Sequence, residues 1–182
     1  MKKRFPVPPL RVGFLKLRTA GLSSAKAATF GMVRRNPDGS PRAHQGTDLA
    51  VDNGYRCYAV DDGIVTRVER GNDGYGWIVQ MKLDETYDYQ NLGGMDQCGR
   101  ISVFYAHLSE IRVRVGQQIG AGEVIGLSGS SGTAQGMSDI SKGSHLHCEV
   151  RTQDRPGIGL AGRIDPLEFL DLDEEKLDNC PD

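Results

Sequence analysis

Short apolar segments closed by turn sequences run through most of the chain. Residues 56–60 and 64–69 are strand-like, and an Asp-Asp-Gly turn sequence at 61–63 separates them. An Asn-Asp-Gly turn at 72–74 precedes residues 77–82, where apolar and polar side chains alternate. The chain has 24 glycines and only 7% aromatic residues, a balance that favours many tight turns over long helices. We therefore expect an all-β domain of mainly antiparallel strands with few short helices.

The remaining segments fit the same architecture. The further elements expected are strands at residues 30–35, 100–108 and 145–152, a hairpin-like corner at 115–126 and a short helix at 166–170. Two polar stretches, 84–99 and 128–144, are expected to be long loops, the first of them an insertion.

The length of 182 residues suits one domain flanked by shorter segments. We expect an N-terminal arm at 1–29 with a short helical turn near 24–28, and a folded domain at 30–170. The tail at 171–182 holds six acidic residues and one lysine and is expected to be solvated. No repeat of 20–50 residues is visible, which argues against a solenoid.

Charge and hydropathy exclude several functions. The net charge is −2 and 25% of residues are charged, so no overall field favours nucleic acid or a membrane surface. No apolar run approaches the length of a transmembrane helix. The chain starts with the basic sequence Met-Lys-Lys-Arg, but no uninterrupted apolar segment follows, so we expect no Sec signal peptide. Work outside the cytoplasm would then need another export route, or a leader absent from this sequence.

The four cysteines, Cys57, Cys98, Cys148 and Cys180, contain no Cys-x-x-Cys spacing, so a cysteine-built zinc site is not expected. One or two disulfides would be feasible in an oxidising compartment, with three possible pairings. We favour the simpler interpretation that Cys57 and Cys148 are small core residues.

His145 and His147 alternate in a strand-like run, so their side chains share one face. His44 and Asp48 are four residues apart, and a regular strand would separate them by about 13 Å. Two ligands of one zinc ion, each bonded at about 2.1 Å, could not span that distance, so the backbone must bend between them. Gly46 permits such a bend. Two histidines and one carboxylate would leave a fourth position for water, as in a hydrolytic zinc site.

The chain resembles the lysostaphin/LytM-type zinc metallopeptidases, which cleave peptide bonds in bacterial peptidoglycan. The resemblance covers roughly residues 30–170. The matching motifs, in order, are His44-Gln-Gly-Thr-Asp48-Leu49, Ala59-Val60-Asp-Asp-Gly63-Ile-Val65, Tyr105-Ala-His107-Leu108, Gly116-Gln117, Gly122, Ile125-Gly126, Gly143-Ser-His145-Leu-His147 and Glu149-Val150-Arg151. All four histidines of the chain fall on motif positions.

The resemblance implies a LytM-like, duplicated-hybrid-type β-sheet domain with a groove that holds one zinc ion per chain. His44, Asp48 and His147 would be the ligands. His145 is assigned as the general base and His107 as the oxyanion-stabilising or water-orienting group, an assignment that leaves open an exchange of the two roles. Glu149 shares the strand face of the histidines, which leaves two interpretations: a carboxylate that supports the metal ligands, or an ordinary solvated carboxylate. The loops at 84–99 and 128–144 are expected to adjoin the groove and to influence substrate choice.

The function implied is a zinc endopeptidase that cuts stem peptides or cross-links of peptidoglycan, in the periplasm or cell wall. The alternative is a non-catalytic or regulatory module that binds the wall or controls other wall hydrolases. A carrier domain is excluded, because no lysine occupies the tip of the 115–126 corner. We further expect an antibacterial effector delivered by a type VI-like system, or a lysin, with a cognate immunity or inhibitor protein as partner. The sequence identifies neither a substrate-binding residue nor the bond that is cut.

Overall fold

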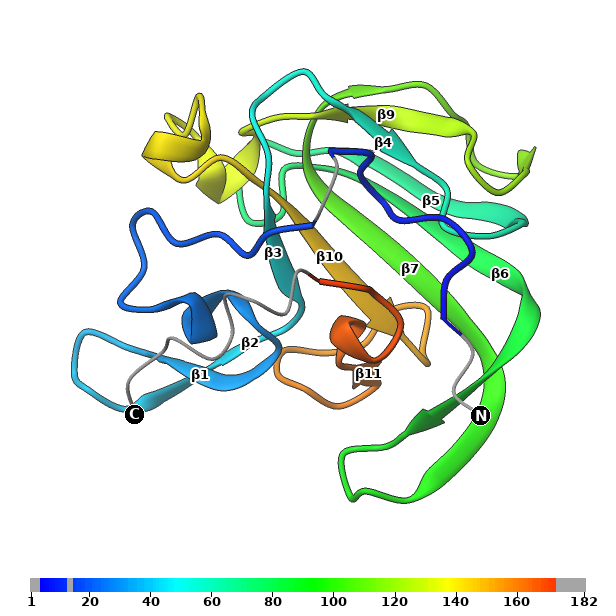
Figure 1. Cartoon of the computed structure of the whole chain (residues 1–182), viewed down its shortest axis with the longest axis horizontal. Helices are drawn as coiled ribbons and strands as arrows, with labels where there is room; N and C mark the ends of the chain where they lie inside the picture. The colour runs from blue at the N-terminus through cyan, green and yellow to red at the C-terminus, as the bar shows by residue number, and fades with distance from the viewer. Residues whose placement is uncertain (1–3, 13–14, 173–182) are drawn as a thin grey trace.

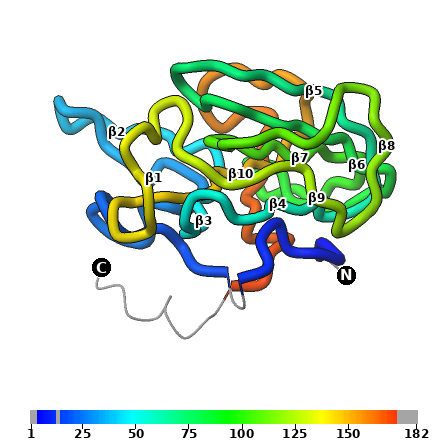
Figure 2. Tube along the Cα trace, turned by 90° about the horizontal axis from the view of Figure 1, so that it is seen from above, coloured from blue at the N-terminus to red at the C-terminus, as the bar shows by residue number. Residues whose placement is uncertain are grey.

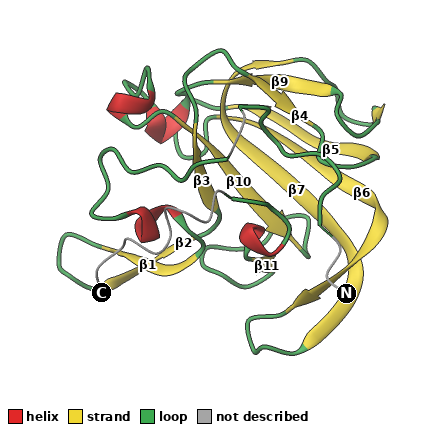
Figure 3. Ribbon diagram, viewed as in Figure 1, coloured by secondary structure: helices red, strands yellow, loops and turns green. Residues whose placement is uncertain are grey.

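Antiparallel strands form almost all of the regular structure (Figure 1; Figure 3). The computed structural model describes residues 4–12 and 15–172. The strands are β1 Gly31–Arg35, β2 Pro41–His44, β3 Thr47–Ala50, β4 Arg56–Tyr58, β5 Gly63–Arg70, β6 Trp77–Gln90, β7 Asp96–Ile111, β8 Gln118–Ile119, β9 Val124–Ser128, β10 His145–Arg151 and β11 Arg163–Ile164. The helical turns among the described residues are all 3-10: η1 Ala25–Ala28, η2 Gly132–Ala134, η3 Ile140–Lys142 and η4 Pro166–Glu168. The all-β expectation is confirmed.

Strand β7 is the hub of a nine-stranded sheet, because it pairs with β6, β9 and β10. Strand β10 runs between β7 and β3, and β1 and β2 form a separate two-stranded sheet. In both overall views this small sheet lies at the opposite end of the molecule from β5, β6 and β8 (Figure 1; Figure 2). The end of β2, in the small sheet, therefore meets β3 and β10 of the main sheet where the two sheets adjoin.

Strand β10 has two different faces, and both are buried. Leu146, Cys148 and Val150 join the main hydrophobic core. The alternate residues on the opposite face are polar: His145, His147, Glu149 and Arg151. Burying the apolar face fixes the register of the strand, since a shift by one residue would exchange the two faces. The core thereby determines where the histidines point.

The N-terminal segment packs against the edge of the main sheet. Phe5, Leu10 and Leu15 belong to its hydrophobic core. Leu10 forms a bridge with Cys57, and Leu17 forms one with Leu49 of β3. The predicted helical turn near residues 24–28 is present as η1. Most of the predicted acidic tail, from residue 173 on, lies outside the described residues.

The expected loop at 84–99 is wrong, because strands β6 and β7 continue through most of it as a two-stranded ribbon. Their paired residues extend to Gln90 and Asp96, so the connecting turn is only 91–95. The ribbon projects beyond the other strands (Figure 1). Tyr87 on its inner face is buried against Phe5 and Phe169.

Two smaller expectations have a clear outcome. The helix expected at 166–170 is a short 3-10 turn, η4, whose Leu167 amide is capped by the Asp165 side chain. Cys57 and Cys148 are buried free thiols, as predicted, and Cys98 is free and exposed. Burial raises the pKa of the Cys148 thiol to about 12. Among the described residues, no helix has the length and apolar character needed to cross a membrane.

Candidate metal centre and active site

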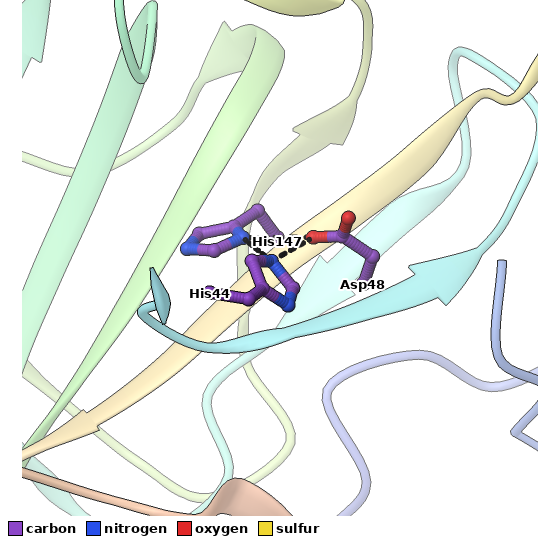
Figure 4. Close-up of side chains that lie close together, drawn as sticks. All are labelled: His44, Asp48 and His147. Carbon is purple, nitrogen blue, oxygen red and sulfur yellow. Dashed lines mark hydrogen bonds and ion pairs between the residues drawn. The ribbon is translucent and has the colours of Figure 1, made fainter. Parts of the chain in front are cut away.

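Three buried side chains converge where β2, β3 and β10 meet (Figure 4). Nε2 of His44 lies 3.1 Å from Oδ1 of Asp48 and 3.3 Å from Nδ1 of His147. Nδ1 of His147 lies 2.8 Å from the same Oδ1. One donor atom from each residue thus faces one point, and the donor atoms lie within 4.8 Å of one another. Sheet register contributes directly, since Asp48 of β3 is the Cα partner of His147.

The backbone turns between His44 and Asp48, as the separation argument required. Strand β2 ends at His44 and β3 begins at Thr47, so Gln45 and Gly46 form the bend. A Cβ atom at Gly46 would lie 2.3 Å from the carbonyl oxygen of Cys148 and 2.8 Å from Cγ of Glu149. Glycine is therefore required because β10 passes too close for any side chain.

Hydrogen bonds fix the tautomers of the two histidines in the three-residue cluster. Nδ1 of His44 donates to the carbonyl of Thr29, 2.8 Å away, because a carbonyl can only accept. Nε2 of His44 is then the nitrogen with the free lone pair. Nε2 of His147 lies 3.1 Å from Oε1 of Glu149 and donates to it, which directs Nδ1 toward the cluster. Both rings offer the nitrogen that a metal ion would need.

Electrostatics distinguish His147 from the other histidines. Burial acts to lower its pKa, but hydrogen bonds with Asp48 and Glu149 outweigh burial and raise the pKa to about 9. Burial acts to raise the pKa of the Asp48 carboxyl, yet its contacts with His147 and His44 hold it well below its usual value. At His44, burial outweighs the nearby Asp48 carboxylate and lowers the pKa of the imidazole. A raised pKa places a proton on Nδ1 of His147 at pH 7, from where it is donated to Oδ1 of Asp48.

His145 and His107 lie beside the cluster with a different arrangement. Nδ1 of His145 donates to the carbonyl of Gly143 at 2.8 Å, and its Nε2 lies 3.7 Å from Oδ1 of Asp48. Nδ1 of His107 donates to the carbonyl of Ser131 at 2.9 Å. The two rings are 5.0 Å apart between centroids. Each ring is anchored through Nδ1 and leaves Nε2 unprotonated.

Both of these histidines are neutral at pH 7. Burial lowers the pKa of His145 to about 4. Burial, followed by the neighbouring His147 and His145, lowers the pKa of His107 to about 3. His107 also has a positive φ of 60°, the only such non-glycine residue among those described. Left-handed backbone at a non-glycine residue is costly and concentrates at functional sites.

Glu149 is the residue that sequence reasoning undervalued. The structure buries it completely and pairs Oε2 with Nε of Arg151 and Nε of Arg163, each at 2.7 Å. The carboxylate is therefore held from two sides while Oε1 binds His147. Such a partner fixes the orientation of a metal-binding imidazole and raises its basicity. Strand alternation places Glu149 and Arg151 on the same face of β10, but the second arginine, Arg163, comes from β11.

Two further arginines contact the outer oxygen of Asp48. Nη2 of Arg34, in β1, donates to Oδ2 at 2.6 Å. Nη1 of Arg18, in the N-terminal segment, lies 3.8 Å from the same oxygen and 3.5 Å from Nδ1 of His145. These contacts leave Oδ1 as the oxygen that faces the histidines. No sequence motif pointed to either arginine.

A groove of about 320 Å³ opens over the cluster. Its lining combines the five predicted site residues with Arg18, Arg34, Arg42, Ala43, Gln45, Gly74, Tyr75, Thr133, Ala134 and Met137. The segment at 128–144 therefore lines the groove, as expected, through Thr133, Ala134 and Met137. The segment at 84–99 contributes no lining residue, so the expectation that it adjoins the groove is wrong.

The fold and the site define a β-sheet protein with a cluster of three donor side chains that could hold a metal ion, in a groove with two neutral histidines beside it. The chain belongs to peptidase family M23, whose family model matches residues 42–157. The resemblance stated from the motifs is thereby confirmed. A solved structure of a zinc-containing peptidase from Vibrio cholerae has the same fold, with a TM-score of 0.62 at 23% identity, over 94% of this chain and 41% of that one.

Three curated relatives illustrate the range of the family. The peptidoglycan DD-endopeptidase ShyA of Vibrio cholerae is 33% identical over 66% of this chain and 23% of its own length. The glycyl-glycine endopeptidase ALE-1 of Staphylococcus capitis is 31% identical over 70% of this chain and 29% of its own. The murein hydrolase activator NlpD of Escherichia coli is 26% identical over 82% of this chain and 32% of its own. The chain thus spans about a quarter to a third of the length of these relatives.

Proposed function

We propose that this chain is a zinc-dependent endopeptidase that hydrolyses peptide bonds in peptidoglycan stem peptides or cross-links. The observation that carries the proposal is the position of His145 and His107. Both line the groove over the three-donor cluster, and both keep Nε2 free of a proton. A purely structural metal site would have no use for two neutral bases beside three protein ligands.

The donor set suits a zinc ion, one per chain. Two imidazole nitrogens and one carboxylate oxygen are ligands that zinc accepts, and three protein ligands are the number found in catalytic sites. Bound zinc would polarise the scissile carbonyl and lower the pKa of a water molecule. Arg34 and Glu149 orient Asp48 and His147 for this binding through the contacts described above.

His145 is the general base in this proposal. Its Nε2 accepts a proton from the attacking water and returns it to the leaving amine. Nδ1 keeps its hydrogen bond to Gly143 throughout, which stabilises the imidazolium that forms. His107 can accept a hydrogen bond from the water at Nε2, because its Nδ1 already donates to Ser131. That protonation state supports a water-orienting role for His107 rather than an oxyanion donor.

A regulatory module is the second candidate, because one relative is named a murein hydrolase activator. Such a module would bind or activate other wall hydrolases without cutting peptides itself. The buried cluster and the two neutral histidines favour the endopeptidase. Activity of the pure protein distinguishes the two candidates.

The direct test is digestion of purified sacculi by the zinc-loaded chain, read by mass spectrometry of the released muropeptides. The endopeptidase should release fragments with new amino termini. The zinc-free variant His44→Ala, treated in the same way, should release none. Unchanged sacculi with the zinc-loaded wild type would favour the regulatory module.

Action in the periplasm or cell wall, as an antibacterial effector or lysin, stays a prediction with a separate test. The chain would be expressed in a bacterium with and without an added periplasmic leader. Growth should stop only when the leader is present, and His145→Ala with the leader should be harmless. Equal growth of the leader-bearing and leaderless wild type would contradict the effector role and remove the need for an immunity protein.

A further inference from the structure

The walls of the groove differ in charge. Its three arginines, Arg18, Arg34 and Arg42, come from the N-terminal segment and from strands β1 and β2. The segments around Tyr75 and Met137 supply only neutral lining residues: Gly74, Tyr75, Thr133, Ala134 and Met137. Asp48 is the one carboxylate in the lining. A chain with a net charge of −2 therefore gathers positive charge on one side of its candidate active site.

Two of the three arginines form ion pairs with Asp48. Arg34 donates to its Oδ2 at 2.6 Å, and Arg18 lies 3.8 Å from the same atom. The side chains of Arg34 and Arg18 are only 17% and 9% exposed. Both guanidinium groups are thus committed to holding the proposed zinc ligand.

Arg42 differs from both. It is exposed, and within residues 4–12 and 15–172 it forms no ion pair or side-chain hydrogen bond. It is the Cα partner of Arg34 across the β1–β2 pair. Like charges directly opposite in an antiparallel pair are destabilising, and an anion beside them would offset that repulsion. The groove therefore keeps one cation available for a ligand.

The position of Arg42 limits where such an anion would lie. Arg42 and His44 occupy alternate positions of β2, so their side chains share a face and their Cα atoms are about 7 Å apart. An extended peptide covers about 7 Å in two residues. A peptide with its scissile bond over the three-donor cluster would bring a side chain one or two residues away to Arg42.

We propose, building on the proposed endopeptidase function, that Arg42 binds a carboxylate of the substrate peptide within about two residues of the scissile bond. Arginine and carboxylate form paired, charge-assisted hydrogen bonds, which a carboxamide cannot match. The preferred substrate is then a stem peptide or cross-link with a free carboxylate. Amidated peptides and glycine-only bridges lack that group and bind more weakly.

Binding to the zinc-loaded His145→Ala protein tests this inference without cleavage. The probes are two pairs of synthetic cross-link peptides, with the carboxylate on the amino side of the scissile bond in one pair and on the carboxyl side in the other. Each acid peptide has a twin with a carboxamide. In at least one pair, the acid should bind roughly tenfold to a hundredfold more tightly than its twin by calorimetry.

Substitution of Arg42 in the same background should remove this difference. Arg42→Gln should weaken the acid peptide to the level of its twin and leave the twin unchanged, while Arg42→Lys keeps part of the preference. Arg35→Gln is the matched control: Arg35 is exposed on the same hairpin, bonds the carbonyl of Gly39 and does not line the groove. It should change neither affinity.

Three results would overturn the inference: equal binding of acid and amide in both pairs, no measurable binding of any acid peptide, or equal weakening of acid and amide by Arg42→Gln. Failure of the proposed function looks different. A zinc-loaded wild type that prefers the acid peptide but cuts no peptide refutes the endopeptidase and keeps the carboxylate site. One that cuts acid and amide at equal rates keeps the endopeptidase and refutes the site.

Discussion

Nε2 of His147 donates to Oε1 of Glu149 at 3.1 Å, and this hydrogen bond turns Nδ1 of the same ring toward Asp48 and His44. The two residues lie two apart on one face of β10. One strand therefore supplies both the proposed ligand and the group that orients it. Arg151 and Arg163 hold Glu149 in its anionic form, so the orientation of His147 depends on three side chains rather than on Glu149 alone.

Glu149→Gln should weaken zinc binding by about tenfold to a hundredfold, because the ligand loses its anionic partner. The free energy of unfolding should also fall by about 3–5 kcal/mol, since Arg151 and Arg163 lose a buried carboxylate. Chelator competition and urea denaturation measure the two effects. Glu110→Gln is the control, because Glu110 pairs with Arg112 at the surface. Zinc affinity within twofold of wild type would show that Glu149 does not support His147.

Zinc binding should release about one proton between pH 6.5 and 9. The pKa of His147 is raised to about 9 in the metal-free protein, so Nδ1 is protonated below that pH and zinc must displace the proton. Zinc affinity should then rise about tenfold per pH unit toward pH 9 and level off above it. Calorimetry in buffers of different ionisation enthalpy counts the protons. No proton release at pH 7.5 would contradict this protonation state.

The raised pKa of His147 also makes the stability of the metal-free protein depend on pH. A histidine with a raised folded-state pKa stabilises the protein fully below its unfolded value, near 6.5, and loses that contribution as pH rises to about 9. His145 and His107 have lowered pKa values, of about 4 and about 3, so their effect on stability has the opposite sign. The stability that depends on these two histidines being neutral is lost as the pH falls below 6.5. His147→Gln should therefore make the metal-free protein less sensitive to alkali between pH 6.5 and 9, as thermal unfolding at each pH measures.

Gly46→Ala should damage both the fold and the metal centre. The new methyl group would meet the carbonyl oxygen of Cys148 at 2.3 Å, so the backbone between His44 and Asp48 must move. We expect a loss of about 1–3 kcal/mol in unfolding free energy and a weaker zinc site. Gly157→Ala is the control, since nothing lies within 4 Å of its would-be Cβ. A Gly46→Ala protein with wild-type zinc affinity would show that β10 has room to adjust.

Phe5→Ala should cost about 3–5 kcal/mol in unfolding free energy, as for other core phenylalanines. Phe5 stacks on Phe169 at 5.1 Å between ring centroids and meets Tyr87 edge-on at 5.6 Å. Leu92→Ala, at the exposed turn of the β6–β7 ribbon, should change stability very little. Equal stability of Phe5→Ala and wild type would show that the N-terminal segment is dispensable for folding.

The sequence was sufficient for the fold class, because strand alternation and turn sequences are local properties, and the five residues assigned by resemblance lie around one groove. His145 and His147 had to share a face, and the distance limit between His44 and Asp48 required a bend, which the structure contains. The reason for Gly46 was only partly foreseen. It is the close approach of β10, a tertiary contact, and not an unusual φ angle.

The misjudged features depend on partners distant in the chain. Glu149 resembles a solvated carboxylate in the sequence, because Arg163, which encloses it together with the neighbouring Arg151, is 14 residues away. The ribbon at 84–99 did carry a strand signal, since Tyr87 and Tyr89 alternate with polar residues, but the glycines nearby suggested a loop. One face of this ribbon is buried because Phe5 and Phe169, which are distant in the sequence, cover Tyr87.

The proposed division of roles, with His147 as a metal ligand and His145 as the base, is tested most directly on the purified His145→Ala protein. Purified His145→Ala should contain one zinc ion per chain by elemental analysis and should digest sacculi at least about a hundredfold more slowly than wild type. Asp48→Ala, prepared in parallel, should lack zinc. Loss of zinc from His145→Ala, or digestion at the wild-type rate, would contradict the assignment of His145 as the base outside the metal centre.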